Sequence, residues 1–214
     1  DFSYCLPKRA ACGEIIFELF KALRLRITKP IATCLYTAIV TDTGSFKYSN
    51  TTSATFEMCA RLVAQGVEVW RVAEQCFETS TAERLLLLSR ALAGLTVHPT
   101  KRIAWITLRH ADFLASGALP EDTEGLINYP RSIDTVEVAI FFKEQADGKI
   151  KVSFRSKETV DVAKLALEWK GGGHARASGC TMMGTMEEVV NRVVERVENY
   201  CSLRSKVKGR RSEI

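Results

Sequence analysis

One change of hydrophobic pattern, near residue 95, limits what this chain of 214 residues can fold into. Before it, apolar residues recur at helical spacing, as in 14–23 (EIIFELFKAL) and 53–66 (SATFEMCARLVAQG). After it, three segments alternate or run apolar in β-branched and aromatic residues, which is typical of strands. These segments are 102–108, 135–144 and 149–156. Asp147-Gly148 between the last two predicts a hairpin turn. The sequence therefore predicts an α/β protein with its helices gathered in the first half.

The remaining elements follow the same periodicities. Further helices are expected at about 30–40, 68–78, 81–93, 160–168 and 185–201, and a short strand is expected near Cys180. We place a helical domain at 1–95, an α/β domain at 96–202 and a basic tail at 203–214. Trp70, Trp105 and Trp169 lie in core-like segments and are expected to pack in the core.

Composition excludes several classes of protein. Seven cysteines at irregular positions, without a CxxC pair, indicate neither a disulfide framework nor a zinc site, so a reducing, cytoplasmic setting is expected. The longest stretch without a charged residue, 30–41, has twelve residues, too few for a membrane helix. Five of the basic residues follow Cys201, so the tail is either an arm that binds phosphates or a solvated end.

The most distinctive segment is 170–179, KGGGHARASG. Gly171, Gly172 and Gly173 leave backbone N–H groups unobstructed, in a loop that can wrap a phosphate. His174 and Arg176 add donors or positive charge beside it. The segment predicts an anion site, although a glycine run can also serve only to turn the chain.

A second candidate is the end of the strand 149–156, in the sequence VSFRSK. On a strand, Arg155 and Lys157 project to one face and Ser156 to the other. The two cations could receive a phosphodiester, and we include all three residues in the candidate substrate-binding set. Without the neighbouring glycines, the same pattern would indicate a solvated strand face.

A third candidate is Asp42 in the segment 37–52, TAIVTDTGSFKYSNTT. An Asp at the end of an apolar segment and before a glycine turn can present a carboxylate to a divalent metal. One carboxylate does not make a metal site, and an Asx turn is the alternative role for Asp42.

Together these segments resemble the DHH phosphoesterase superfamily, and within it the oligoribonuclease and pAp phosphatase (nanoRNase) branch. The stretch 37–52 resembles the fourth motif of the DHH catalytic domain, and 171–179 resembles the signature of the DHH-associated C-terminal domain. The segments 152–157 and GLINYPRSI (125–133) also match, so the resemblance covers about residues 10–200. It implies the helical C-terminal part of a DHH domain followed by an α/β substrate-binding domain with a mixed sheet.

The resemblance also implies an activity and its ligands. The family hydrolyses phosphate esters at a centre of two Mn²⁺ or Mg²⁺ ions, of which Asp42 would be one ligand. Arg155, Gly171, Gly172, Gly173 and His174 would hold the terminal phosphate of a short single-stranded RNA or DNA, or of a mononucleotide. A homodimer is implied as well.

The departures from the family pattern leave alternatives open. The N-terminal GHxxPDGD-like motif, an isolated Asp and the DHH triplet are missing, and the chain has only three His. We therefore expect a part of a longer DHH protein that is itself inactive. The other possibilities are a non-catalytic nucleotide or nucleic-acid binding module and a cyclic dinucleotide phosphodiesterase.

Overall fold

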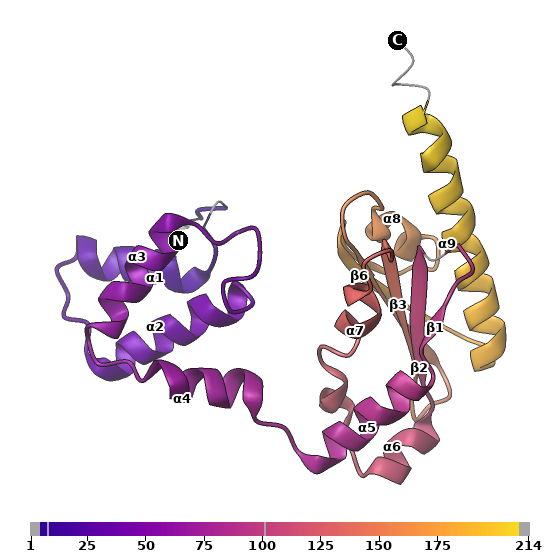
Figure 1. Ribbon diagram of the computed structural model, residues 1–214, viewed down its shortest axis with the longest axis horizontal. Helices are drawn as coiled ribbons and strands as arrows, with labels where there is room; N and C mark the ends of the chain where they lie inside the picture. The colour runs from indigo at the N-terminus through magenta and orange to yellow at the C-terminus, as the bar shows by residue number, and fades with distance from the viewer. Residues whose placement is uncertain (1–4, 8, 101, 210–214) are drawn as a thin grey trace. The chain divides into compact units, whose positions relative to one another are not determined.

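The computed structural model describes residues 5–7, 9–100 and 102–209, and beyond Cys201 it describes the backbone alone. Internal contacts divide the chain into two compact units, residues 1–79 (unit 1) and 80–214 (unit 2). The chain is α/β, as the sequence predicts: unit 1 is helical, and unit 2 is built on a six-stranded mixed sheet (Figure 1). None of the described helices is both long and apolar enough to cross a membrane.

Unit 1 is a small helical unit with its own core. Its elements are α1 (Cys12–Ala22), α2 (Lys29–Asp42), α3 (Ser53–Val63), α4 (Val69–Ala73) and the π-helical turn η1 (Glu74–Glu78). Helix α3 begins with a reciprocal cap, because the hydroxyl of Thr52 accepts from Thr55 N at 3.3 Å and Thr52 N donates to the hydroxyl of Thr55 at 3.2 Å. The centre of the core is fully buried and consists of Ala32, Ile39 and Leu62.

Two side chains of unit 1 differ from what their residue types suggest. Trp70 was expected in the core but is 60% exposed, and the Arg71 guanidinium lies 5.4 Å from the centroid of its ring. Glu14 is charged but only 1% exposed. Its carboxylate accepts from the Thr55 hydroxyl at 2.6 Å and from Ala10 N at 3.1 Å, and these bonds satisfy the buried group.

Unit 2 contains all the described strands. Its helical elements are α5 (Ala82–Ala93), α6 (His110–Ser116), the 3₁₀ turn η2 (Pro120–Thr123), α7 (Asn128–Ser132), α8 (Val162–Leu167) and α9 (Met186–Gly209). Its strands are β1 (Thr96–Val97), β2 (Ile103–Leu108), β3 (Val138–Glu144), β4 (Ile150–Ser156), β5 (Gly172–His174) and β6 (Ala177–Met182). The three predicted strands are confirmed as β2, β3 and β4, with Gly148 at φ +75° in the turn of the predicted hairpin.

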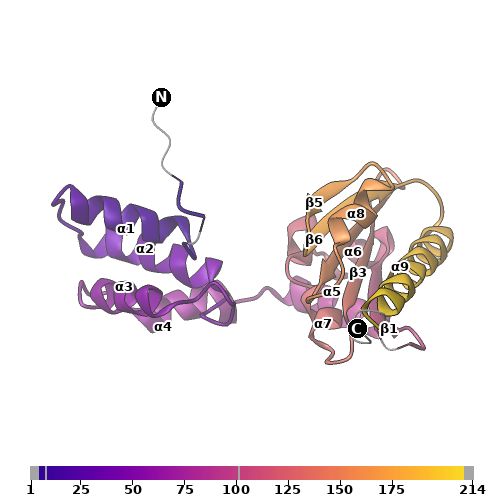
Figure 2. The same cartoon turned by 90° about the horizontal axis from the view of Figure 1, so that it is seen from above.

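The strand order is β1-β2-β3-β4-β6-β5, with β2 and β3 parallel and every other pair antiparallel. One face of the sheet, the covered face, packs on α8 and α9 through fully buried side chains such as Phe142, Phe154 and Val193 (Figure 2). On the opposite face, helices pack over β2 and β3, where Leu87 and Ala91 of α5 are buried. We call the β4, β6 and β5 part of this second face the open face.

The structural division comes earlier in the chain than the boundary expected between 95 and 96. Helix α5 belongs to unit 2 because Leu87 and Ala91 are buried with Ile106 and Leu108 of β2. The predicted basic tail at 203–214 falls on residues whose side chains lie outside the described part, although the backbone of α9 continues to Gly209.

Candidate phosphate-binding site

From Ile150 to Arg155, the alternation of β4 separates the polar from the apolar side chains. Ile150, Val152 and Phe154 are buried on the covered face, whereas Lys151, Ser153 and Arg155 lie on the open face and are half-buried or exposed. Residues paired across a sheet share a face, so the strand register shows which side chains accompany Arg155.

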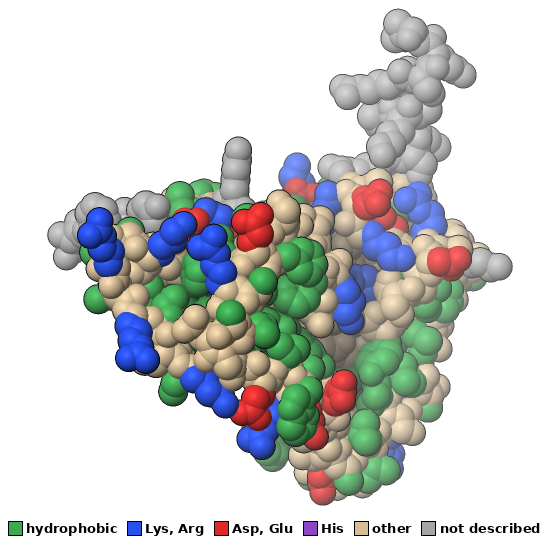
Figure 3. All heavy atoms as spheres, turned by 60° about the vertical axis from the view of Figure 1, so that its left-hand side comes forward, with side chains coloured by type: hydrophobic (Ala, Val, Ile, Leu, Met, Phe, Trp, Pro, Cys, Tyr) green, Lys and Arg blue, Asp and Glu red, His purple; other side chains and the backbone are tan. Residues whose placement is uncertain are grey.

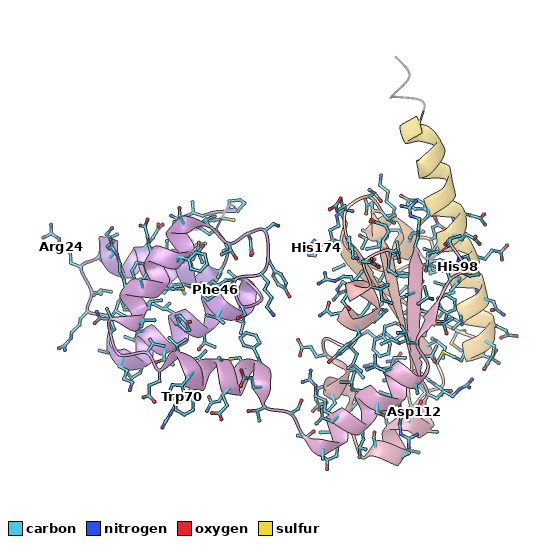
Figure 4. All side chains as sticks on the ribbon, in the orientation of Figure 1. Arg24, Phe46, Trp70, His98, Asp112 and His174 are labelled. Carbon is cyan, nitrogen blue, oxygen red and sulfur yellow. The ribbon has the colours of Figure 1, made fainter. Side chains whose placement is uncertain are left out.

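The register places Arg155 and His174 in one row across three strands. Arg155 pairs with Ala177 of β6, and Ala177 pairs with His174 of β5. The next row along the strands consists of Ser153, Gly179 and Gly172. Because the members on β6 are small, the Arg155 and His174 side chains have room between them. In Figure 4 the labelled His174 lies at the margin of the unit 2 sheet.

The Arg155 guanidinium is half-buried beside a second cation. Its Nη1 donates to its neighbour's carbonyl, Phe154 O, at 3.0 Å. Burial lowers the pKa of Arg155, and the positive charge of Arg131, from α7, lowers it further. Among the ion pairs of the described residues, none involves Arg155 or Arg131. Two such cations without a carboxylate form a site suited to an anion.

The glycine run is not the loop that the sequence predicts. Gly172 to His174 form β5, which pairs with β6 in an antiparallel ladder. A Cβ on Gly171 would lie 2.2 Å from Gly179 O, and one on Gly173, at φ +137°, would lie 2.5 Å from Ala177 O. These two glycines are therefore required by the close approach of β6. A Cβ on Gly172 would meet no atom of the protein within 4 Å, so packing does not require a glycine at this position.

Three residues of the predicted substrate-binding set donate to the backbone instead. The Ser156 hydroxyl is buried on the covered face and donates to Val160 O at 2.6 Å. Arg176 Nη1 donates to the same carbonyl at 2.8 Å. Lys157 Nζ donates to Ile133 O at 2.6 Å and to Asp134 O at 3.0 Å. These contacts shape the chain after β4, and the structure does not bring the three groups into the row of Arg155.

Sequence reasoning missed Glu137, which fixes the same segment. Its Oε1 accepts from the backbone N–H groups of Glu158, Thr159 and Val160 at 3.1, 2.6 and 2.9 Å. Burial by itself would raise the pKa of Glu137, but these bonds outweigh it and lower the pKa below its ordinary value. Arg131 was missed as well, although it lies in the matching stretch 125–133. No local pattern marks either residue, since both act through contacts distant in sequence.

Asp42 is an exposed residue at the end of α2 in unit 1. The predicted Asx turn is replaced by a contact of its neighbour, because Phe46 N donates to the Thr43 hydroxyl at 3.2 Å. The chain then passes through three consecutive left-handed residues, Gly44, Ser45 and Phe46, at φ +56°, +58° and +63°. Such backbone is strained in non-glycine residues and is found most often at functional sites.

The residues near Asp42 do not fit a two-metal centre. Across the described ranges, no three His, Cys, Asp or Glu side chains gather closely enough to hold a metal ion. Two bridged metals need several such ligands.

Comparison with known proteins assigns the family. Residues 110–203 match the model of the DHHA1 domain. The Bacteroides fragilis exopolyphosphatase-related protein, a solved structure, is 32% identical with a TM-score of 0.84, over 92% of this chain and 58% of the other. The chain belongs to the DHH phosphoesterase superfamily.

Several curated relatives carry the name of one branch of this superfamily. The bifunctional oligoribonuclease and PAP phosphatase NrnA of Thermus thermophilus is 28% identical over 89% of this chain and 57% of the relative. The probable enzyme of the same name from Streptococcus mutans is 31% identical over 87% of this chain and 59% of the relative. The chain thus spans about three fifths of the length of these relatives.

Proposed function

We propose that unit 2 binds the terminal phosphate of a nucleotide between Arg155 and His174. The binding site would belong to a phosphoesterase that acts on short oligonucleotides or on PAP. The observation that carries this proposal is the half-buried Arg155 guanidinium, beside Arg131 and in one row with His174. The names of the superfamily relatives support the substrate class.

The electrostatics favour an anion at this position. A half-buried guanidinium loses part of its hydration, and a second cation nearby disfavours its charge further. A phosphate placed against Arg155 reverses both effects, because it accepts charge-assisted hydrogen bonds and screens the repulsion from Arg131. The half-buried position of Arg155 and its closeness to a second cation therefore favour the binding of an anion.

Each residue of the row has a distinct part in this binding. Arg155 presents a planar fork that can donate two parallel hydrogen bonds to phosphate oxygens. His174 is exposed on the edge strand and can donate from a ring nitrogen. Ala177 between them leaves the space that a phosphate needs.

Calorimetry with adenosine monophosphate tests the proposal on the full chain. Arg155→Ala and His174→Ala should each weaken binding about tenfold to a hundredfold, since a hydrogen bond to a charged group contributes about 1.5–3 kcal/mol. Lys164→Ala, which removes an exposed cation on α8, is the control and should bind as the wild type does. Equal affinity in Arg155→Ala and wild type would refute the site, as would no binding by the wild type.

A second candidate function is nucleotide binding without turnover. It is favoured by the absence, among the described residues, of a group of side chains that could hold a metal ion. Incubation of the purified chain with Mn²⁺ and either a short labelled RNA or PAP separates the two functions. Product formation that Asp42→Asn abolishes would support hydrolysis with Asp42 as a metal ligand. A homodimer, also proposed from the family, would be detected by light scattering.

A further inference from the structure

A hollow of about 340 Å³ lies in unit 1, between the end of α1, the α1–α2 connection and α3. Its lining combines apolar side chains, among them the buried ring of Phe17, with polar and basic ones. The lining residues are Phe17, Lys21, Leu25, Arg26, Ile27, Arg61 and Gln65. Its volume falls in the range of small-molecule sites, about 300–1,000 Å³.

The charge around this hollow is one-sided. Between Glu18 and Asp42 the sequence has four basic residues and no acidic one. Figure 3 shows Lys and Arg side chains predominating on the face of unit 1 that is turned to the viewer. Lys29 is neutralised by Glu68, whose carboxylate lies 2.6 Å from its Nζ.

The cations that line the hollow are not neutralised in this way. None of the ion pairs among the described residues involves Lys21, Arg26 or Arg61. The carboxylates of α1 and α3 do not line the hollow: Glu14 is buried, Glu18 pairs with Arg9, and Glu57 lies one turn before Arg61. Three cations therefore share the lining with apolar side chains, and no carboxylate belongs to that lining.

A further cation, Arg24, lies beside the hollow at a backbone position that is unfavourable for a side chain. Arg24 follows the end of α1 at φ +54°, where Leu25 N donates to Phe20 O at 2.9 Å. Glycine is the usual residue at this left-handed position, since other residues lose about 1–2 kcal/mol there. Figure 4 shows Arg24 projecting outward from the connection. The helix end thus carries a long cation where a glycine would be more stable.

We propose that this hollow is a second anion site, which takes a phosphate-bearing nucleotide. Arg26 and Arg61 bind the phosphate, and Phe17, Leu25 and Ile27 contact the apolar part of the ligand. Two guanidinium forks and the Lys21 ammonium match a dianion with three acceptor oxygens better than they match a carboxylate. The apolar side chains of the lining favour a ligand with a ring over a free anion. This site goes beyond the proposed function, which concerns unit 2 alone.

Amide spectra of the full ¹⁵N-labelled chain test the site residue by residue. Adenosine monophosphate should shift the amides of 25–27 and 61–65, and inorganic phosphate should shift the same amides with weaker affinity. Arg26→Gln/Arg61→Gln should raise the dissociation constant measured at these amides at least tenfold. Gln65→Glu, which adds a carboxylate to the rim without removing a cation, should raise it several-fold. The control Lys164→Gln/Arg192→Gln, with the same change of charge on unit 2, should leave it unchanged.

Three results would overturn the assignment. They are no response of these amides to adenosine monophosphate, an unchanged dissociation constant in Arg26→Gln/Arg61→Gln, and a response to acetate as strong as that to phosphate. The variant Arg155→Ala separates this site from the one in unit 2. If its unit 1 amides still respond, the inference stands whatever happens at the row of Arg155.

Discussion

Arg155 and His174 lie two strands apart in one row of the unit 2 sheet, with Ala177 paired to both. Neighbouring strands are about 4.8 Å apart, so the two Cα atoms are separated by about 10 Å, a span that the two side chains and a phosphate can fill. The small side chain between them is therefore as important to the proposed site as the two donors.

This relationship predicts the effect of filling the row. Ala177→Leu places a branched side chain between Arg155 and His174 on the open face, where it displaces the ligand without entering the core. We expect adenosine monophosphate to bind at least tenfold more weakly, while the free energy of unfolding changes by about 1 kcal/mol or less. The matched control is Thr181→Leu, on the same strand and face but opposite Lys151. Calorimetry of both variants decides, and equal weakening in both would count against the row.

The glycines of β5 predict a contrast in stability. In Gly173→Ala the new Cβ would lie 2.5 Å from Ala177 O, and the backbone there has a positive φ that disfavours a side chain. We expect this variant to lose about 1–3 kcal/mol of its free energy of unfolding. Gly172→Ala meets nothing within 4 Å, and we expect a change of about 1 kcal/mol or less. Urea unfolding of the two variants measures the difference. A tolerated Gly173→Ala would show that β5 does not pair closely with β6.

The same strand shows what the sequence could and could not predict. Alternation along 149–156 assigned the faces of β4 correctly, and the Asp147-Gly148 turn placed the hairpin. Glycine has a low strand propensity, so the strand that contains Gly172 and Gly173 is determined by pairing with β6, which no local pattern shows. Ser156 and Lys157 were predicted to bind substrate from their residue types and position. In the structure their side chains donate to backbone carbonyls, Ser156 to Val160 and Lys157 to Ile133 and Asp134. Local periodicity thus found the elements, whereas distant contacts decided which polar groups are available.

Glu137 predicts a dependence of stability on pH. Its folded pKa lies below the ordinary value of about 4.3, so its carboxylate stabilises the fold above that pH. The contribution is lost as the pH falls through the folded pKa. We expect Glu137→Gln to lower the free energy of unfolding by about 1 kcal/mol at pH 7, because a neutral amide oxygen accepts the three N–H bonds less strongly. The difference from wild type should shrink between pH 5 and pH 3, and a constant difference in urea unfolding would contradict this account.

Glu14 predicts a larger loss confined to unit 1. Glu14 is 1% exposed, and its carboxylate accepts hydrogen bonds from the Thr55 hydroxyl and from Ala10 N. The Arg9 guanidinium is farther away, with its Nη1 4.0 Å from Glu14 Oε2. Glu14→Ala leaves the Ala10 N–H buried without its acceptor, and it leaves the Thr55 hydroxyl only Thr52 Oγ1, at 3.1 Å, as a group to which it can donate. Each buried donor that loses its acceptor costs about 1–3 kcal/mol. The core of unit 1 shares no residue with the two cores of unit 2, so the loss of stability should be confined to the amides of unit 1.

Hydrogen exchange measures this effect in both units at once. Protection should fall by about one to four powers of ten across α1, α2 and α3 and stay unchanged across β2, β3 and β4, since each 1.4 kcal/mol is a factor of ten. Glu18→Ala is the control, because it removes a half-exposed partner of Arg9, and pairs of that kind contribute about 1 kcal/mol or less. A uniform fall in protection over both units would mean that they unfold together. A fall in Glu14→Ala no larger than that in Glu18→Ala would mean that the buried carboxylate does not hold α1 to α3.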